Sequence, residues 1–242
     1  ITQHFIYFGG IFVINFFNWN SMDTVENAED VQSDESEYEE IAHTAAEVLE
    51  LMEEAWLNEK FAPEILPHKY DIVECLLGQI SHVEENLTNV GNDDLRRSLH
   101  QMELDRLRYL VSSYLRMRLE KIETYVYFIL KQEEERSQKG EENYLNKNEL
   151  EFAKAYMQSL DQHFTDRLHF WPGNIPTEWK NQLIIPNIHS FVFMKAKNEI
   201  EGVMVSHVNE EEEVVDLRTG SQILISYSNV GHFIKTNQSC LI

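Results

Sequence analysis

The stretch from Ser98 to Glu123 constrains this chain more than any other feature, because its apolar residues do not keep to one side of a helix. At helical spacing, one face carries Leu99, Met102 and Leu110, and another face carries Leu104, Val111, Leu115 and Ile122. A helix on the surface of a globular protein needs apolar cover on one side only. The pattern therefore predicts the central helix of an assembly, covered from more than one direction.

The helical pattern around this stretch extends from about residue 93 to about residue 134, with room for a break inside it. A continuous helix of that length would measure about 60 Å, which no compact domain of about 90 residues covers alone. Asn92 is suited to cap its start, and Asp93 and Asp94 are favourable at the positive end of the helix dipole.

Shorter helices are expected on both sides. Thr44-x-x-Glu47 is a capping box that predicts a helix from about 45 to 60, and the prolines at 63 and 67 end it. Apolar spacing predicts a second helix over 72–87, which stops near Gly91. Asn146-x-x-Glu149 is a further capping signal, and it predicts a helix that ends near residue 168.

The period of the pattern changes after Trp171-Pro-Gly-Asn-Ile-Pro176, a segment that breaks helices and is taken as the domain boundary. Runs rich in Val, Ile, Phe and Tyr then predict short strands, with a turn at Thr219-Gly220. The predicted strands are 190–196, 202–207, 214–217, 223–227 and 240–242, and a short helix is predicted over 230–236. The expected fold class is α+β, with a mainly helical N-terminal domain and a small C-terminal β-rich domain.

Composition narrows the classes of function. The 242 residues are 43% hydrophobic, which is enough for a real core, and carry a formal net charge of -22. Such a charge repels phosphate backbones, so autonomous DNA binding is not expected and partners with basic surfaces are favoured. The two cysteines give no disulfide framework, which fits a reducing compartment.

The long helix holds the basic residues that could form a nucleic-acid patch. They are Arg96, Arg97, Arg106, Arg108, Arg116, Arg118 and Lys121. They scatter round the helix among acidic residues, which suits ion pairs within the helix and between subunits better than a phosphate track. Arginine makes bidentate contacts with carboxylates, so Arg106, Arg108 and Arg116 are the candidates for pairing at an interface.

Patterns typical of catalysis or metal binding are missing from the sequence. It has no nucleophile elbow, phosphate-binding loop or dinucleotide fingerprint. Glu40-x-x-His43 has the spacing of a di-iron ligand pair, but a second copy is missing, and His163 and His169 lack zinc-ligand neighbours. The chain is therefore predicted to be a non-enzyme without a metal or other cofactor.

The first 43 residues are interpreted in two parts. Residues 1–21 carry no charged side chain and five phenylalanines, but the apolar run is too short for a membrane span and lacks the basic start of a signal peptide. They are expected to be a translated leader before Met22, or a disordered segment. Residues 22–43 are expected to form a disordered acidic tail, because nine acidic residues and no Lys or Arg lie between 23 and 40.

Two motifs together resemble a known family. Trp56–Leu66, WLNEKFAPEIL, and the stretch 98–123 closely resemble the Sld-five type of subunit of the eukaryotic GINS complex, over about residues 44–242. The resemblance implies a nuclear, non-catalytic scaffold in a heterotetramer with three Psf subunits. It further implies that the complex joins the MCM ring and a RecJ-like protein in the CMG replicative helicase, for initiation of DNA replication and fork progression.

The expected domains follow from the pattern and the resemblance together. A helical GINS A-type domain is expected over 44–170, a linker over 171–176 and a small B-type domain over 177–242. The acidic tail is expected to be a solvated segment, with docking of a replication adaptor as the alternative. Candidate interface or structural residues are Trp56, Phe61, Pro63, Arg106, Arg108, Tyr109, Tyr114, Leu115, Arg116, Leu241 and Ile242. The alternative function is a stand-alone acidic adaptor that binds basic partners through residues 23–40.

Overall fold

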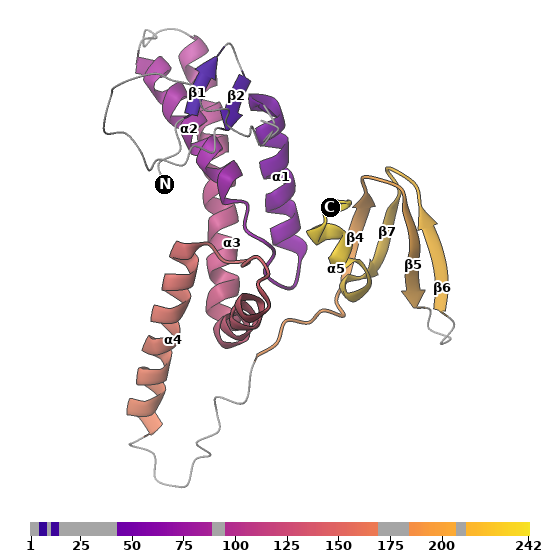
Figure 1. The fold of residues 1–242 in the computed structure, drawn as a ribbon. Coiled ribbons are helices and arrows are strands. Elements are labelled where there is room, and N and C mark those ends of the chain that lie inside the picture. Colours follow the sequence, from indigo (N-terminus) through magenta and orange to yellow (C-terminus); the bar gives the residue numbers. More distant parts are fainter. Residues whose placement is uncertain (1–4, 9–10, 15–42, 89–94, 169–183, 207–211) are drawn as a thin grey trace, which may run out of the picture. The chain divides into compact units, whose positions relative to one another are not determined.

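The computed structural model describes residues 5–8, 11–14, 43–88, 95–168, 184–206 and 212–242. After short N-terminal strands come four helices, α1 (Ala45–Phe61), α2 (Tyr70–Thr88), α3 (Leu95–Lys139) and α4 (Lys147–Leu168), and a small region of strands follows them (Figure 1). This order confirms the predicted α+β class with a long central helix.

The N-terminal segment contributes three short strands. β1 (Phe5–Phe8) pairs antiparallel with β2 (Ile11–Ile14), and β2 pairs antiparallel with β3 (His43–Thr44). The acidic tail falls almost wholly within residues 15–42, outside the described residues. Its interpretation as a docking tail, and that of residues 1–21 as a leader, stay predictions.

Both predicted capping boxes are confirmed. The backbone N–H of Thr44 donates to Glu47 Oε2 at 2.9 Å, and the N–H of Glu47 donates to Thr44 Oγ1 at 3.3 Å. At the start of α4, the N–H of Asn146 donates to Glu149 Oε2 at 3.0 Å. These bonds satisfy backbone donors that the first turn of a helix leaves open. The predicted caps at 92–94 lie outside the described residues.

Helix α3 is 45 residues long and contains one non-helical residue, Tyr125, with φ -118° and ψ 26°. This kink confirms the predicted break. Leu104, Val111 and Ile122 are buried as expected for one of the two apolar faces. On the other face Leu110 is buried, whereas Leu99 and Met102 are 57% and 69% exposed. The chain therefore covers one side of the first part of α3 and leaves another side in water.

The chain divides into two compact units that do not coincide with whole helices. The first unit comprises Ile1–Met52 and Asp71–Arg108. It takes buried apolar residues from α1, α2 and α3, for example Met52, Leu76 and Leu104. An ion pair between Arg108 of α3 and Glu84 of α2 adds a polar link on its surface.

The second unit comprises Glu53–Tyr70 and Tyr109–Ile242. One of its apolar clusters joins the later part of α3 to α4, with Ile122 and Ile129 from α3 and Ala153 from α4. Ile65, in the turn after α1, belongs to the same cluster. Burial of these side chains fixes α4 against α3 although a loop at 140–146 separates the two helices.

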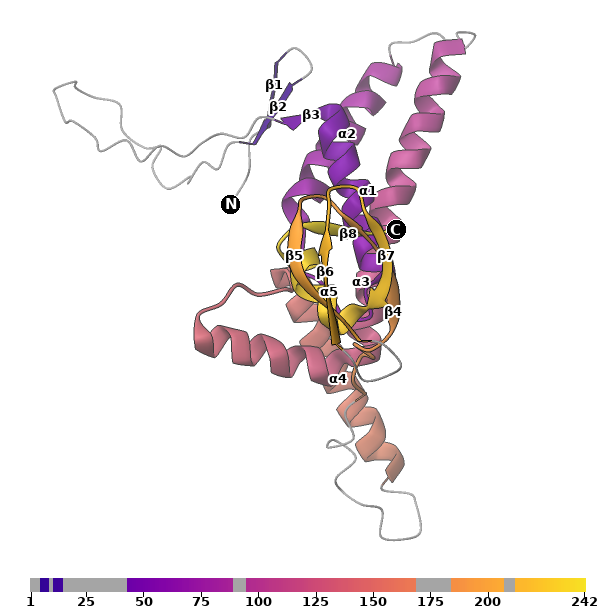
Figure 2. The same cartoon turned by 90° about the vertical axis from the view of Figure 1, so that its right-hand side faces the viewer.

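The C-terminal strands and helix α5 (Tyr227–Lys235) gather into one small module in both views (Figures 1 and 2). β4 (Phe191–Ala196) is the central strand of a sheet ordered β7-β4-β8, with β7 (Gln222–Ser226) and β8 (Ser239–Leu241) antiparallel to it. β5 (Ile200–Ser206) and β6 (Glu212–Leu217) form a separate antiparallel ribbon. These elements confirm the predicted strands and short helix with small shifts at their ends.

The core of this module follows from strict alternation along β4. Val192, Met194 and Ala196 point inward, and the residues between them are exposed. The inward side chains pack with Val230 and Ile234 of α5 in one apolar cluster. Ala62 and Leu66, from the end of α1 and the turn after it, belong to the same cluster. The module therefore shares its core with the second unit's helical part.

The fold predicts a large difference between two identical substitutions. Met194→Ala removes a side chain with no exposure from the shared core and is expected to lower the free energy of unfolding by about 2–5 kcal/mol. Met204→Ala, on the exposed side of β5, is the control and is expected to cost less than about 1 kcal/mol. Equilibrium urea unfolding followed by circular dichroism measures both, and equal losses would contradict the assigned core.

Candidate protein interaction site

Arg118 of α3 is the largest fully buried side chain in the described part of the chain. Its guanidinium forms a bidentate pair with Glu149 of α4, with Nε to Oε1 at 2.7 Å and Nη2 to Oε2 at 2.9 Å. Nη1 donates to Glu59 Oε2 of α1 at 3.2 Å. The carbonyl oxygens of Leu66 and Tyr144 accept the remaining bonds at 2.8 and 2.9 Å. One side chain thus joins two helices and two loops to α3.

Lys121 completes this cluster one turn further along α3. Its ammonium donates to Glu59 Oε1 at 2.8 Å and to the carbonyl oxygens of Glu59 and Glu64 at 2.6 and 2.8 Å. Burial lowers the pKa of Lys121, and the charge of Glu59 opposes part of that effect. We call Glu59, Arg118, Lys121 and Glu149 the ionic junction. Its two cations and two carboxylates balance, so no net charge is buried.

Glu149 pairs with Arg118 and also closes the capping box of α4, where it accepts the bond from the N–H of Asn146. Burial by itself would raise the pKa of its carboxyl group, but the hydrogen bond and charge of Arg118 outweigh burial. The net pKa lies below the usual value. The sequence signal for the cap was therefore correct but incomplete, because the spacing of a capping box does not show that its carboxylate also pairs with a residue 31 positions away.

Polar contacts also tie the C-terminal module to α1 and the turn after it. Asn58 Oδ1 accepts a hydrogen bond from the backbone N–H of Leu241 in β8 at 2.7 Å. Glu64 accepts a bond from the Tyr227 hydroxyl at 2.9 Å and pairs with Lys235 at 2.7 Å. Asn58 and Glu59 lie in the stretch Trp56–Leu66, which carries the family resemblance. The N–H of Ala62 donates to the Asn58 carbonyl at 3.0 Å, so the stretch also holds the turn that ends α1.

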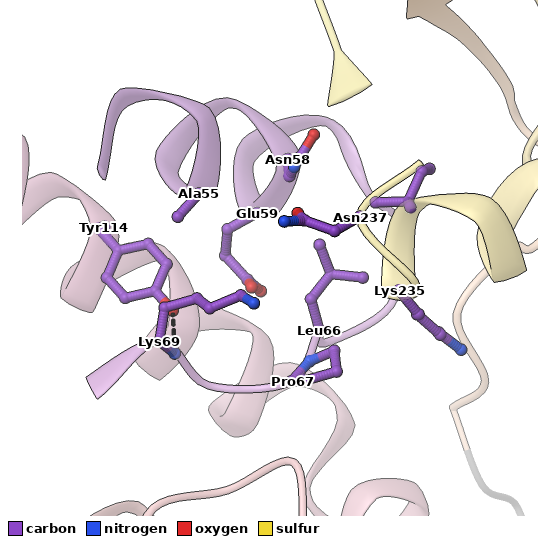
Figure 3. Close-up of a pocket in the computed structure, with 10 residues that line it drawn as sticks. Ala55, Asn58, Glu59, Leu66, Pro67, Lys69, Tyr114, Lys235 and Asn237 are labelled. Carbon is purple, nitrogen blue, oxygen red and sulfur yellow. Dashed lines mark hydrogen bonds between the residues drawn. The ribbon is translucent and has the colours of Figure 1, made fainter. Parts of the chain in front are cut away.

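A small cavity of about 30 Å³ lies beside these contacts (Figure 3). Glu59, Leu66 and Asn237 point into it, and the Tyr114 hydroxyl at its edge accepts a hydrogen bond from the backbone N–H of Lys69 at 3.2 Å. A water molecule needs about 10–15 Å³ of such space, so the cavity has room for one or two. It forms part of the polar packing around the ionic junction.

Several of the candidate residues named from sequence lie inside the second unit. Tyr114 is buried, and burial raises the pKa of its hydroxyl to about 12. Trp56 is half-buried and donates from Nε1 to Ser113 Oγ at 2.9 Å. Pro63 and Leu115 are half-buried, and Leu241 is buried in β8. These positions suit a structural function within the chain.

Other candidates are exposed. Tyr109 and Arg116 of α3, Phe61 of α1 and Ile242 lie at the surface. Arg106 pairs with Glu103 at 3.7 Å, and Arg108 pairs with Glu84 and with Asp105. The interface assignments stay predictions. Arg118 and Lys121 were recognised from sequence only as members of a scattered basic set. The signal that could have singled out Arg118 is its spacing, seven residues after Val111 and four before Ile122, which places it on the apolar face of α3.

Among the described residues, no group of three or more His, Cys, Asp or Glu side chains has the arrangement of a metal site. Helices in the same part of the chain are too short or too polar to cross a membrane. The described residues do present exposed apolar side chains, among them several on α3 and on the strands of the C-terminal module.

Comparisons with known proteins match both halves of the chain. Residues 79–167 match the GINS complex protein helical bundle domain, and residues 186–242 match the C-terminus of the DNA replication complex GINS protein SLD5. The SLD5 protein of Mus musculus is 41% identical over 208 residues, which is 84% of this chain and 93% of the mouse protein. The SLD5 protein of Rattus norvegicus is 40% identical over 91% of this chain and 100% of its own length. That of Homo sapiens is 38% identical over 84% and 93%.

Removal of Arg118 tests the ionic junction. Arg118→Met leaves buried carboxylates without their main partner and is expected to lower the free energy of unfolding by about 3–5 kcal/mol. Arg116→Met, two residues away and exposed, is the control, with an expected change below about 0.5 kcal/mol. Urea unfolding monitored by tryptophan fluorescence measures both variants. A loss below about 1 kcal/mol in Arg118→Met would contradict the importance of the junction.

The lowered pKa of Glu149 predicts a dependence on pH. A carboxyl group with a lower pKa in the folded state contributes stability that is present above its unfolded pKa, near 4.3, and is lost as pH falls through the folded pKa. Below about pH 4.3, the free energy of unfolding should therefore fall more steeply in the natural protein than in Glu149→Gln. Glu151→Gln, an exposed neighbour on α4, should keep the natural slope in the same urea titrations.

Proposed function

Because the chain belongs to the SLD5 family of DNA replication complex GINS proteins, we propose that it is a non-catalytic scaffold subunit of a GINS heterotetramer in the nucleus. Its partners in the tetramer are three Psf subunits. Through that complex it joins the MCM ring and a RecJ-like component in the CMG helicase, and so supports initiation of replication and fork progression. The acidic tail at 22–43 serves as a docking site for a replication adaptor.

The observation that carries the scaffold proposal is an exposed apolar stripe on α3. Leu95, Leu99 and Met102 follow at intervals of four and three residues, so they share one side of the helix. All three are more than half exposed, with Leu95 at 74%. We call these three residues the α3 stripe. Tyr109, seven residues after Met102, is also exposed and adds to the apolar side chains that α3 presents to water.

The energetics favour a partner on the stripe. Full burial of a leucine or methionine side chain contributes about 1.5–3 kcal/mol, so three large apolar side chains in water are unfavourable in an isolated chain. Contiguous exposed apolar residues with charged residues around them are typical of subunit interfaces. Arg106 continues the same spacing and supplies a charge at the edge of the stripe, where it influences the choice of partner more than affinity.

The charge of the chain supports a function through protein contacts. Its net charge of -22 opposes autonomous binding to DNA. Of the basic residues on α3, Arg118 and Lys121 are buried against carboxylates, and Arg106 and Arg108 pair with acidic residues of the same chain. These pairings favour a function through protein contacts over direct binding of DNA.

Co-expression tests the proposal directly. Residues 22–242 are produced alone and together with the three Psf subunits of the same source, and solubility and mass are measured by light scattering. An equimolar complex of four chains, more soluble than the chain alone, is the expected result. A well-behaved monomer that does not bind the Psf subunits would contradict the proposal and favour the stand-alone acidic adaptor.

A single substitution in the α3 stripe should separate assembly from folding. Leu99→Asp places a charge in the proposed interface and is expected to weaken assembly by at least about tenfold, while the melting temperature of the chain changes little. Leu77→Asp is the matched control, because Leu77 is also an exposed leucine of the first unit but lies on α2. Gel filtration of the co-expressed proteins measures assembly. Equal complex formation by both variants would show that the stripe is no interface.

A further inference from the structure

The sheet of the C-terminal module has an outer face that the described residues of the chain leave uncovered. Phe191 and Phe193 of β4 are 73% and 59% exposed, and Leu224 of β7, paired directly with Phe193, is 52% exposed. Ile242 lies next to them, because its backbone N–H donates to the Phe193 carbonyl at 3.1 Å. The residues between them on β4 point into the core. Phe191 and Phe193 are therefore exposed because side chains alternate between the two faces of the strand.

A positive charge continues this face along the same strand. Lys195 follows Phe193 by two residues, is exposed, and therefore points to the same side of the sheet. Its cross-strand neighbours are Gln222 on β7 and Cys240 on β8, neither of which is an acidic residue. We call Phe191, Phe193, Lys195 and Leu224 the outer sheet face. Its complement is a row of apolar side chains with a carboxylate at one end.

The size of the face limits what can cover it. Five residues along β4 and two strand spacings across give a footprint on the order of 200 Å², whereas a stable protein–protein interface needs about 800 Å² from each partner. A second folded copy of this chain would also bring a net charge of -22 against the same charge. A short segment of another protein fits the area and the charge.

We propose that the outer sheet face binds a short amphipathic peptide segment of a partner protein. The apolar side chains of that segment pack on Phe191, Phe193 and Leu224, and an Asp or Glu of the segment pairs with Lys195. The proposed surface shares no residue with the α3 stripe, so it is a second docking site, separate from the one proposed for assembly with the Psf subunits.

The probe is a display library of random 12-residue peptides, applied to the full chain alone and in its complex. Enriched peptides are synthesised with a fluorescent label, and their affinity is measured by anisotropy. Phe193→Ser/Leu224→Ser removes the central apolar pair of the face. Met204→Ser/Val214→Ser is the matched control, because those two residues are also an exposed apolar cross-strand pair, on β5 and β6 of the same module.

Enriched peptides are expected to contain at least two large apolar residues and one acidic residue. Phe193→Ser/Leu224→Ser should weaken their binding by at least about tenfold, and the control pair should leave it unchanged. Lys195→Glu should weaken acidic peptides by about fivefold or more and strengthen peptides in which Lys replaces the acidic residue. This reversal distinguishes a docking contact from loss of folding, which circular dichroism checks in each variant.

Three results would overturn the proposal. One is the absence of enriched peptides, or enrichment that Phe193→Ser/Leu224→Ser does not affect. Another is a concentration-dependent dimer that the same variant abolishes, which would assign the face to a second copy. The last is peptide binding to the chain alone but not to its complex, which would assign the face to a sister subunit. If the chain does not bind the Psf subunits, peptide binding to the chain alone still tests the outer sheet face. The two proposals can therefore be contradicted independently.

Discussion

The buried guanidinium of Arg118 is the interaction on which the second unit depends. It contacts carboxylates of α1 and α4 and carbonyl oxygens in the two loops that precede α2 and α4. An arginine in an apolar interior is unfavourable unless every charge and donor is matched, and the matching partners come from segments far apart in the sequence. The junction can therefore form only when α1, α3 and α4 have reached their native positions. Other arrangements of these helices would leave the buried charges unpaired, so the junction favours the native packing.

The same segment of chain positions the C-terminal module. Glu59 turns toward Arg118, while Asn58, one residue before it, accepts a hydrogen bond from β8. Glu64, five residues later, supplies its carbonyl to Lys121 and its carboxylate to Tyr227 and Lys235. The turn from 58 to 66 is thus shared between the ionic junction and the small sheet. A substitution that disrupts the ionic junction is therefore expected to weaken the contacts between this turn and the small sheet as well.

Local signals in the sequence predicted the elements well, because their causes are local. The boxes at Thr44 and Asn146 fixed helix starts, and the run rich in Val and Phe at 190–196 indicated the strand β4. The ionic junction could not be predicted in this way. Arg118 lies seven residues after Val111 and four before Ile122, so helical spacing places it on the apolar side of α3, whereas Arg116 faces another side. Which segments supply its carboxylate partners, Glu59 and Glu149, depends on the packing of distant parts of the chain. The scattered basic residues of α3 predicted ion pairs but not these partners.

The distribution of charge links these structural features to assembly. The second unit balances its buried charges internally, so the ionic junction gives no specificity toward other proteins. Specificity must then come from exposed residues, where apolar side chains supply affinity and a few charges at the edges select the partner. The α3 stripe with Arg106 and the outer sheet face with Lys195 both have this composition. In a chain with so large a negative charge, a cation beside an apolar patch offsets the general repulsion locally, and this favours the approach of a partner segment that carries a carboxylate.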